Sequence, residues 1–395
     1  MEPEHPFSIV CLSSQEWRSA LPTNRQQIMS RAAERGHSVL FVETGGWLGR
    51  HLWRLLRGPR RGSLVRRLTF GEEAGNGVQV AKLWTIIPLA QRYELANRVN
   101  WRLGSWTLRV AVRKLPGPRI LWIYDPRAVD ALGTFEETFA VYDCVDDYPE
   151  QARYDERSYA LVAAADRLAG RQARLVFATT QPLLERHRQA NANTHLVPNV
   201  GDFEHFAVAS DRSYAEPELL ALPRPVLGFF GNIEPSKIQF GILRSLSDAF
   251  PDGTVLVVGP ARGDGRQQIE QLATAANVRW LGFRDYVDLP RVLAAFDVAL
   301  IPYAENDYTR SCFPLKLFEY LSAGKPVVAT GLPALAGLEP HVVVADGADG
   351  AIAAVRAALD RRENGKEERI AFAAQNTWDT RTTRLLSLVE TELSK

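Results

Sequence analysis

Short apolar runs alternate with longer amphipathic or polar stretches along almost the whole chain. Most of these runs are continuous, which is typical of strands in a parallel sheet that is covered on both faces. The pattern predicts strands over residues 7–12, 39–42, 120–124, 139–143, 175–179, 195–197, 226–230, 254–258, 278–281, 298–301, 327–329 and 342–344. Helices are predicted over residues 25–35, 153–171 and 315–322. This alternation of strand and helix predicts an α/β fold with doubly wound parallel sheets.

The pattern is interrupted after residue 197, where turn-forming residues and then Pro217, Pro223 and Pro225 follow without clear periodicity. A chain of 395 residues also exceeds what one hydrophobic core usually supports. We therefore expect two Rossmann-like domains, residues 1–200 and 224–377, joined by a linker over 201–223. Such sheets bind ligands at the carboxyl ends of their strands, so a cleft between two facing sheets is the expected active site.

The composition is that of a folded globular protein, with 46% apolar and 24% charged residues. No apolar run approaches the roughly 20 residues of a membrane-spanning helix. The first run, residues 7–12, is too short for a signal-peptide core and lacks a basic flank, so we expect a cytoplasmic protein. Cys11, Cys144 and Cys312 are isolated from one another, and their spacing predicts neither a disulfide framework nor a zinc site.

The net charge of +1 is unevenly distributed along the chain. Residues 1–200 contain 27 lysines and arginines against 20 acidic residues, whereas the remainder contains 20 against 26. The stretch 44–71 contains no acidic residue and combines arginines with tryptophans and leucines. This composition suits the anionic inner face of a membrane, so we expect peripheral association. Nucleic acid is a rival partner, but no recognised nucleic-acid module accompanies the stretch, and a basic surface loop is the other alternative. The predicted membrane contacts are Trp47, Arg50, Trp53, Arg54, Arg57, Arg60 and Arg61.

The most informative segment is residues 306–330, which reads NDYTRSCFPLKLFEYLSAGKPVVAT. A helix is predicted to begin after Phe313-Pro314 and to end at Gly324, before the next strand. Lys316 in its first turn would oppose the helix dipole, so an anionic ligand is expected to compensate this lysine. Glu319 lies on roughly the same face, where a carboxylate can accept hydrogen bonds from two ribose hydroxyls.

This segment resembles the nucleotide-sugar signature of GT-B fold glycosyltransferases, especially the large retaining, family 4-like group. Its pattern is similar to bacterial capsule, teichuronic acid and exopolysaccharide glycosyltransferases, and the tail of the segment, 323–328, matches their Gly-x-Pro-Val-Val. Where the retaining group has the first of two glutamates, this chain has Ser311, so the stereochemical outcome stays open. The matching residues are Asn306, Thr309, Arg310, Pro314, Lys316, Glu319, Tyr320 and Leu321.

The resemblance implies transfer of a sugar from a nucleotide diphosphate sugar, with a UDP-sugar favoured, to an acceptor hydroxyl. No cluster of His, Cys and carboxylate residues in the sequence suggests a metal site, so we expect no metal or other cofactor. The acceptor implied is a lipid-linked saccharide in bacterial surface polysaccharide synthesis. Glu319 would hold the ribose, and Phe283 with Arg284 would cover the base. Lys316, Lys237, Thr309 and backbone amides near Phe313 would hold the diphosphate. The further donor-side positions are Gly231, Asn232, Gly259, Asn306 and Ser311.

The N-terminal half also matches the subgroup, at Trp17, Arg25 and residues 141–147. The resemblance therefore places acceptor contacts at Trp17, Arg25 and Asp143. Asp146 or Asp147 would orient or deprotonate the acceptor, although helix capping is the alternative for these aspartates. The family fold also brings the last helix, residues 378–393, back onto the N-terminal domain.

Two other functions fit the same fold. A nucleotide-sugar 2-epimerase would share the donor site but has no evident use for the basic stretch, and a non-catalytic nucleotide-sugar binder is suggested by Ser311. Turnover separates the three possibilities. A transferase gives free nucleotide and a longer acceptor, an epimerase gives an isomeric sugar, and a binder gives neither.

Overall fold

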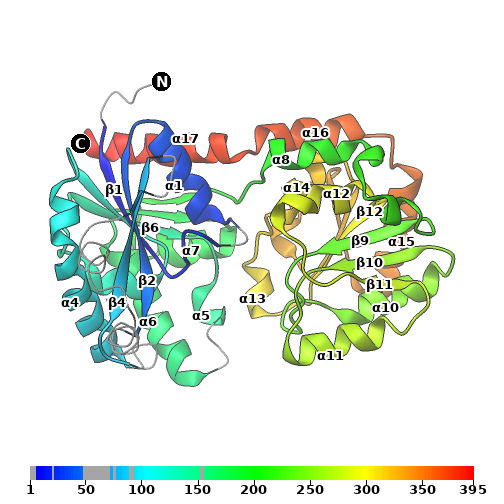
Figure 1. Ribbon diagram of the computed structural model, residues 1–395, viewed down its shortest axis with the longest axis horizontal. Helices are drawn as coiled ribbons and strands as arrows, with labels where there is room; N and C mark the ends of the chain where they lie inside the picture. The colour runs from blue at the N-terminus through cyan, green and yellow to red at the C-terminus, as the bar shows by residue number, and fades with distance from the viewer. Residues whose placement is uncertain (1–5, 20–21, 48–71, 74–76, 89–92, 152–154) are drawn as a thin grey trace, which may run out of the picture. The chain divides into compact units, whose positions relative to one another are not determined.

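The chain folds into two compact units in a computed structural model, which describes residues 6–19, 22–47, 72–73, 77–88, 93–151 and 155–395 (Figure 1). The first unit comprises Met1–Pro198 together with Thr382–Lys395, and the second comprises Asn199–Arg381. Among the described helices, none combines the length and the apolar composition that crossing a bilayer requires.

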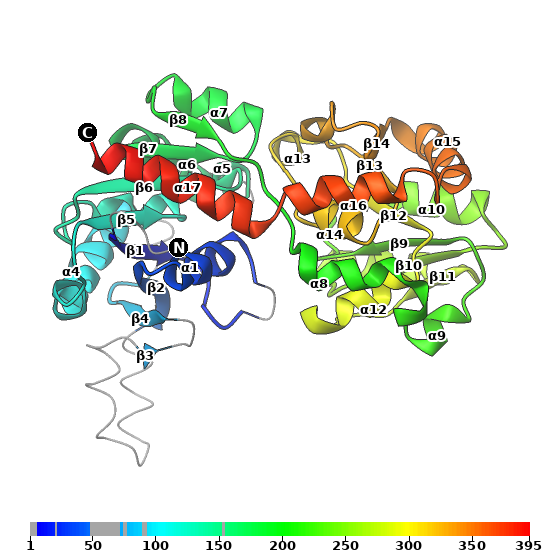
Figure 2. The ribbon, with the colours of Figure 1, turned by 90° about the horizontal axis from the view of Figure 1, so that it is seen from above.

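The first unit is built on an eight-stranded sheet in the order β3-β4-β2-β1-β5-β6-β7-β8. Every neighbouring pair is parallel except β3 and β4. The strands are β1 (Ser8–Ser13), β2 (Ser38–Trp47), β3 (Glu72–Glu73), β4 (Val78–Thr85), β5 (Arg119–Ile123), β6 (Phe139–Cys144), β7 (Leu175–Ala178) and β8 (Thr194–Leu196). The helices are α1 (Asn24–Glu34), α4 (Glu94–Arg113), η1 (Pro126–Ala131), α5 (Tyr148–Gln151), α6 (Glu156–Gln172) and α7 (Gln181–Arg188), and they lie around the sheet (Figure 2).

The second unit has a six-stranded, fully parallel sheet in the order β11-β10-β9-β12-β13-β14. Its strands are β9 (Val226–Phe230), β10 (Thr254–Val258), β11 (Val278–Trp280), β12 (Val298–Pro302), β13 (Val327–Thr330) and β14 (Val342–Ala345). Its helices are α8 (Phe203–Ala207), α9 (Pro217–Leu220), α10 (Phe240–Ala249), α11 (Gly263–Leu272), α12 (Leu289–Ala294), α13 (Asp307–Arg310), α14 (Lys316–Ser322), α15 (Gly347–Asp360) and α16 (Lys366–Gln375), with short 3-10 turns η2 (Val208–Ser210), η3 (Arg212–Tyr214), η4 (Tyr286–Asp288) and η5 (Pro333–Leu335).

The predicted fold class is confirmed, since both units are α/β and are built on parallel sheets. Strands β1, β9, β10 and β12 are buried at every position, which explains their continuous apolar runs. Each predicted strand overlaps a strand of the structure, but β3 and β4 were not predicted. In β4 the buried Val78, Ala81 and Leu83 are interrupted by polar residues, so the strand lacks the continuous run.

The prediction of a linker over 201–223 is wrong. This segment forms α8, η2, η3 and α9, and its buried Phe206, Ala209 and Leu219 belong to the hydrophobic core of the second unit. Burial of these side chains removes apolar surface from water, so the segment is part of the unit rather than a connection to it.

The last helix, α17 (Trp378–Leu393), begins in the second unit and continues into the first. Near its end the buried carboxylate of Glu392 accepts hydrogen bonds from Arg174 and, at 3.2 Å, from the side-chain amide of Asn193. These two partners, on the loops before β7 and β8, tie the end of α17 to the first unit.

Each sheet changes its winding direction at one point. In the second unit the chain moves from β9 to β10 and β11 on one side, and from β12 to β13 and β14 on the other, so the change falls between β9 and β12. In the first unit the corresponding change falls between β1 and β5. At such a point the loops that follow the two neighbouring strands run in opposite directions. They leave a crevice for ligands at the carboxyl ends of the strands.

Candidate functional site

Glycine turns follow β9 and β10 at the carboxyl edge of the second sheet. Gly231 has φ 148° and Gly259 has φ 142°, and a Cβ on Gly259 would lie only 1.9 Å from the carbonyl oxygen of Gly231. The amide of Gly259 donates to the carbonyl of Gly282 at 2.7 Å, which places the turn after β11 beside it. Only glycine permits this close approach of backbones, so Gly231 and Gly259 are required by the shape of this edge.

Lys316 extends from α14 to the crevice between β9 and β12. Its Nζ donates to the hydroxyl of Tyr303, just after β12, at 2.9 Å and lies 5.6 Å from the ring centroid of Phe229 in β9. A Cβ on Gly231 would lie 3.3 Å from the same Nζ. No carboxylate lies within ion-pair distance of this ammonium in the described part of the chain. An anionic ligand at the switch point would supply the missing charge.

Glu319 lies one turn after Lys316 on α14, and its side chain is half-buried. Burial raises the pKa of Glu319 to about 7, against the opposing influence of Lys316 and with a further contribution from Asp202. Across the described residues its carboxylate makes no hydrogen bond to the protein. A desolvated carboxylate without a protein donor is suited to accept hydrogen bonds from hydroxyl groups of a ligand.

Lys237 and the Phe283–Arg284 loop are placed at the same edge of the sheet. The Lys237 ammonium lies 3.6 Å from a carboxylate oxygen of Glu234 and 5.1 Å from the ring centroid of Tyr308. Phe283, after β11, is 46% exposed, which is unusual for a phenylalanine and leaves its ring open to stacking. Arg284 is half-buried beside it, and Asn232 is exposed in the turn after Gly231.

The residues around α13 are mostly used to build the loop. Asn306 and Thr309 form a reciprocal capping box, with both hydrogen bonds at 2.9 Å. Thr309 is fully buried and its hydroxyl donates to the carbonyl of Ala304, so the expected contact of Thr309 with the diphosphate is corrected to a positioning role. Ser311 is buried at the end of α13, and the carbonyl of Phe313 accepts a hydrogen bond from Asn199 at 2.7 Å.

In the first unit, Arg25 lies at the switch point between β1 and β5. It is 6% exposed, donates to the hydroxyl of Tyr148 at 2.9 Å and places its guanidinium 5.2 Å from the ring centroid of Tyr124. Its Nε, in contrast, has no hydrogen-bond partner in the described structure. A buried guanidinium with a free donor at the carboxyl edge of a sheet is suited to bind a polar ligand group.

Asp143, at the end of β6, and the two aspartates that follow this strand differ sharply from one another. Asp143 is fully buried and accepts from the indole of Trp122 at 3.3 Å, and Asp147 is 1% exposed and paired with both terminal nitrogens of Arg186 at 2.9 and 2.5 Å. The expected acceptor contact of Asp143 and the expected catalytic role of Asp147 are therefore corrected to structural roles. Asp146 remains half-buried, and its carboxylate accepts hydrogen bonds from the backbone amide of Asp147 and from Gln151.

Trp17 packs its ring edge-on against Phe41, with 5.0 Å between centroids, and its amide donates to Glu43 at 2.8 Å. These contacts hold the loop after β1 against β2. Of the predicted membrane contacts, Trp47 ends β2, and its side chain lies outside the described structure. The others, Arg50, Trp53, Arg54, Arg57, Arg60 and Arg61, lie entirely outside the described residues.

A buried group that the sequence did not reveal lies between β6, α6 and α7. Cys144, Asp166 and His187 place potential metal-ligand atoms within 4.8 Å of one another. The carboxylate of Asp166 already accepts from the hydroxyl of Tyr142 at 2.6 Å and lies 3.5 Å from His187 Nε2. Burial raises the pKa of the Cys144 thiol well above its usual value, which disfavours the thiolate that binds metal ions. The group is therefore best explained as a buried hydrogen-bond network.

Sequence reasoning also missed Tyr303 and Asp202 at the donor-side edge. Tyr303 orients Lys316, and Asp202 influences Glu319 while accepting from the hydroxyl of Tyr286 at 3.3 Å. Tyr303 could have been noticed because it directly follows a predicted strand, where ligand-contacting residues gather. Asp202 is more than a hundred positions from Glu319, and no local pattern links them.

The fold defines an α/β protein of the doubly wound class, with a lysine, a carboxylate and glycine turns at the switch point where such folds bind ligands. Comparison with known proteins makes the class more specific: residues 224–361 match the family described as glycosyl transferases group 1. The matched residues all lie within the second unit.

Curated relatives match over part of their length. The chain is 36% identical over 194 residues to TuaH of Bacillus subtilis, named as a teichuronic acid biosynthesis glycosyltransferase, which covers 47% of this chain and 48% of TuaH. It is 27% identical over 249 residues, 58% of this chain and 56% of the relative, to a 2-deoxystreptamine N-acetyl-D-glucosaminyltransferase of Streptomyces fradiae. The chain thus spans about half the length of the curated relatives it matches.

Solved structures resemble the whole chain. HepE of Anabaena, crystallised with UDP and glucose, is 18% identical with a TM-score of 0.66, covering 97% of this chain and 99% of HepE. Sucrose-phosphate synthase of Thermosynechococcus elongatus is 15% identical with a TM-score of 0.72, covering 98% and 99%. These likenesses confirm the predicted GT-B fold.

Proposed function

We propose that the chain is a glycosyltransferase that moves a sugar from a nucleotide diphosphate sugar to a hydroxyl group of an acceptor. The observation that carries this proposal is the placement of Lys316 and Glu319 at the switch point between β9 and β12. Within the described residues, Lys316 is hydrogen-bonded to Tyr303 but has no carboxylate within ion-pair distance, and the carboxylate of Glu319 accepts no hydrogen bond from the protein. The group 1 match over residues 224–361 and the names of the curated relatives support the same activity.

The donor roles follow from the chemistry at this edge. Lys316 and Lys237 carry the positive charge that a diphosphate requires, so the reaction is proposed to need no metal ion. Glu319 accepts the ribose hydroxyls, and the exposed ring of Phe283, with Arg284, covers the base. UDP is the favoured nucleotide because HepE was crystallised with UDP. Asn306, Thr309 and Ser311 position the loop that leads to α14.

Catalysis is proposed to rest on positioning and on stabilisation of the departing diphosphate. The ammonium of Lys316 is fixed by Tyr303, so it stabilises developing negative charge with little reorganisation. On the acceptor side, Arg25 offers its free Nε–H, and Asp146 orients or deprotonates the attacking hydroxyl.

The acceptor is proposed to be a lipid-linked saccharide of a bacterial surface polysaccharide, reached by peripheral binding at the cytoplasmic face of the membrane. Helix α4 supports this location. Its side chains Leu103, Trp106 and Val110 are 50%, 68% and 50% exposed, at helical spacings of three and four residues. The neighbouring Arg102 and Arg109 are also exposed. An apolar stripe flanked by arginines suits the interface of an anionic membrane.

A thermal-shift screen with UDP-, GDP- and ADP-linked sugars tests the donor site, because a ligand that binds only the folded state raises Tm. We expect a selective rise with a UDP-sugar, and no rise with any nucleotide sugar would overturn the proposal. Turnover with the selected donor then identifies the reaction. A lengthened acceptor supports transfer, whereas an isomerised donor or an unchanged donor would replace it with epimerisation or simple binding.

A further inference from the structure

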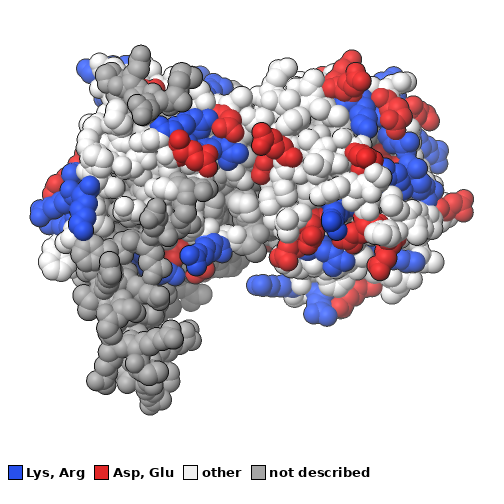
Figure 3. Space-filling view, turned by 45° about the horizontal axis from the view of Figure 1, so that its top comes forward, with Lys and Arg blue, Asp and Glu red and all other residues white. Residues whose placement is uncertain are grey.

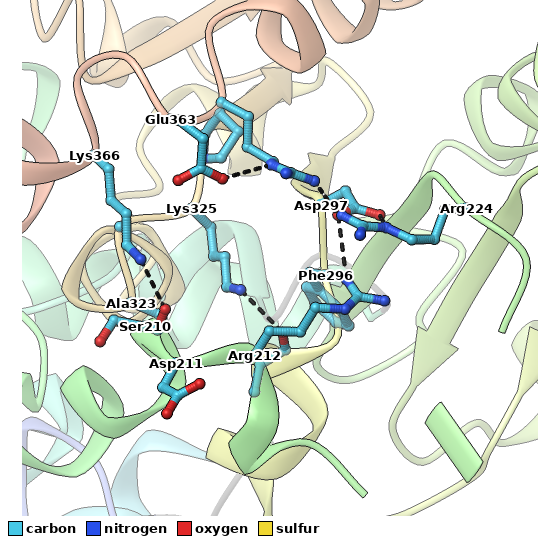
Figure 4. Close-up of a pocket in the computed structure, with 14 residues that line it drawn as sticks. Ser210, Asp211, Arg212, Arg224, Phe296, Asp297, Ala323, Lys325, Glu363 and Lys366 are labelled. Carbon is cyan, nitrogen blue, oxygen red and sulfur yellow. Dashed lines mark hydrogen bonds and ion pairs between the residues drawn. The ribbon is translucent and has the colours of Figure 1, made fainter. Parts of the chain in front are cut away.

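A pocket of the Asn199–Arg381 unit lies at the opposite edge of the sheet from Gly231 and Lys316. It is a cavity of about 470 Å³. Arg224, Asp297 and Lys325 stand one to two residues before β9, β12 and β13, so the cavity lies at the amino ends of three parallel strands. The remaining walls come from η2, η3, the end of α12, the turn after α14, the loop after α15 and the start of α16 (Figure 4).

The side chains that line this cavity are strongly basic. Arg212, Arg224, Lys325, Arg362 and Lys366 face Asp211, Asp297 and Glu363, which leaves a net charge of +2. On the face of the molecule shown in Figure 3, basic and acidic side chains are interspersed over this unit.

One buried carboxylate organises three of the five cations. Asp297 is 1% exposed, and its Oδ1 accepts from Arg212 at 3.3 Å, from Arg362 at 2.7 Å and from Arg224. Figure 4 shows Arg212 and Arg224 approaching this carboxylate from different segments. Arg362 also donates to Glu363 at 3.0 Å, so two carboxylates face the three guanidinium groups. The arrangement fixes the arginines in place and leaves one positive charge of the three without a carboxylate.

Among the described residues, neither of the two lysines has a carboxylate within ion-pair distance. Lys325, 9% exposed, donates to the carbonyl of Ala294 at 3.0 Å, and Lys366 donates to the carbonyl of Ser210 at 2.9 Å. Burial lowers the pKa of Lys325 to about 7, and the nearby cations Lys366, Arg212 and Arg362 act in the same direction against Asp297. A buried ammonium is costly without a counter-charge, and an anion in the cavity would provide one.

We propose that this pocket binds a phosphorylated small molecule, with Lys325 and Lys366 as direct ligands of the phosphoryl group. A phosphoryl dianion matches the net charge of the pocket, and guanidinium and ammonium groups are its usual partners. The volume lies within the 300–1,000 Å³ range of small-molecule sites, which leaves room for more than the phosphoryl group itself. The shared chemistry allows either free phosphate or a phosphate ester as the source.

Calorimetric titration of the full chain with inorganic phosphate and with a hexose 6-phosphate tests the site, at constant ionic strength set with chloride. Lys325→Met and Lys366→Met should each weaken binding of the tighter ligand at least tenfold. Lys366→Arg should retain it, as should Arg266→Gln, which removes one positive charge from the exposed face of α11. Tighter binding of the ester identifies a phosphorylated metabolite, and equal binding identifies free phosphate.

The titrations are repeated with UDP present, so that phosphate held at the donor edge can be recognised. Binding that UDP displaces belongs to that edge and would overturn the proposal. The same conclusion follows if wild type binds neither probe, or if both lysine-to-methionine variants, shown by circular dichroism to be folded, bind as tightly as wild type. Failure of UDP to bind would count against the proposed activity, but it would leave the comparison of the lysine variants valid.

Discussion

The side chain of Lys316 lies directly over the α-carbon of Gly231, where a Cβ would stand 3.1 Å from Lys316 Cε and 3.3 Å from its Nζ. The glycine therefore does two things: it permits the turn at φ 148°, and it leaves the space through which the lysine reaches the crevice. Two residues that are 85 positions apart in the sequence thus meet at the proposed diphosphate position.

Replacing Gly231 with alanine should displace the Lys316 ammonium and strain the turn, because L residues rarely adopt this φ. We expect affinity for the nucleotide diphosphate sugar to fall about tenfold, equivalent to roughly 1.4 kcal/mol, measured by calorimetry. The matched control is Gly241→Ala in α10, where a Cβ would contact nothing within 4 Å and alanine favours the helix. Equal affinities in the two variants would contradict the assigned role of Gly231.

Glu319→Gln should weaken nucleotide-sugar binding at pH 8, where the carboxylate is ionised and accepts from the ribose hydroxyls. Loss of a hydrogen bond to a charged group is worth roughly 1.5–3 kcal/mol, or about ten- to hundredfold in Kd. At pH 5.5 the native carboxyl is protonated, so the difference between wild type and variant should shrink. Glu270→Gln, on the exposed face of α11, controls for the charge change and should bind as wild type. An unchanged Kd at pH 8 would remove Glu319 from the site.

The same substitution should change the pH dependence of stability. The carboxyl of Glu319 has a pKa of about 7 in the folded protein against an ordinary value of 4.5. Between these values the folded state holds a proton that the unfolded state has released, so this group makes the protein less stable as pH rises. Glu319→Gln should therefore gain unfolding free energy relative to wild type between pH 5 and pH 8, on the order of 1–3 kcal/mol. Urea denaturation at both pH values measures it, and a parallel pH dependence in the two proteins would disprove the shift.

A fragment covering residues 199–381 should fold by itself and retain weak nucleotide binding, because it contains the whole second core and every donor-side residue. A shorter fragment, 223–376, lacks Phe206, Ala209 and Leu219 and should be much less stable, since loss of buried apolar side chains leaves a large cavity. Thermal denaturation compares the two fragments. A folded 199–381 fragment that fails to bind UDP would mean that the first unit contributes to the donor site.

The sequence predicted those parts of the fold that depend on local composition. Strands such as β10, in which Val255, Leu256, Val257 and Val258 are all buried, have the same apolar run that predicted them. Strand β4 was missed because Lys82 interrupts it, and this lysine is satisfied by an ion pair of 3.0 Å with Glu43 in the neighbouring β2. A partner in another strand cannot be read from a local pattern.

In the candidate site, too, the sequence predicted only what local spacing determines. Lys316 and Glu319 lie three residues apart on one short helix, so their spacing alone predicted that both face the same edge of the sheet. In the sequence, Asp147 resembles a free carboxylate after a strand. In the structure, Arg186, 39 residues later, donates hydrogen bonds to both of its carboxylate oxygens. The cavity around Asp297 depends on arginines from three separate segments, and it had no signature in the sequence at all.

The last prediction concerns the membrane. Trp106 and Leu103 are exposed on α4 beside Arg102 and Arg109, so substitution of both apolar residues by serine should reduce flotation with anionic vesicles without unfolding the protein. The control is Leu168→Ser on α6, which removes an exposed leucine outside the α4 stripe.

A further variant changes Arg54, Arg57, Arg60 and Arg61 to serine and tests the basic stretch 44–71. Each basic residue near an anionic surface contributes about 1 kcal/mol to membrane binding. Because the Debye length shrinks to roughly 3 Å at 1 M salt, high salt should remove the contribution of the arginines to vesicle binding. The contribution of Trp106 should remain. If wild type does not float at low salt, or if the α4 variant floats as well as the Leu168→Ser protein, α4 is an ordinary surface helix. The acceptor would then be a soluble saccharide.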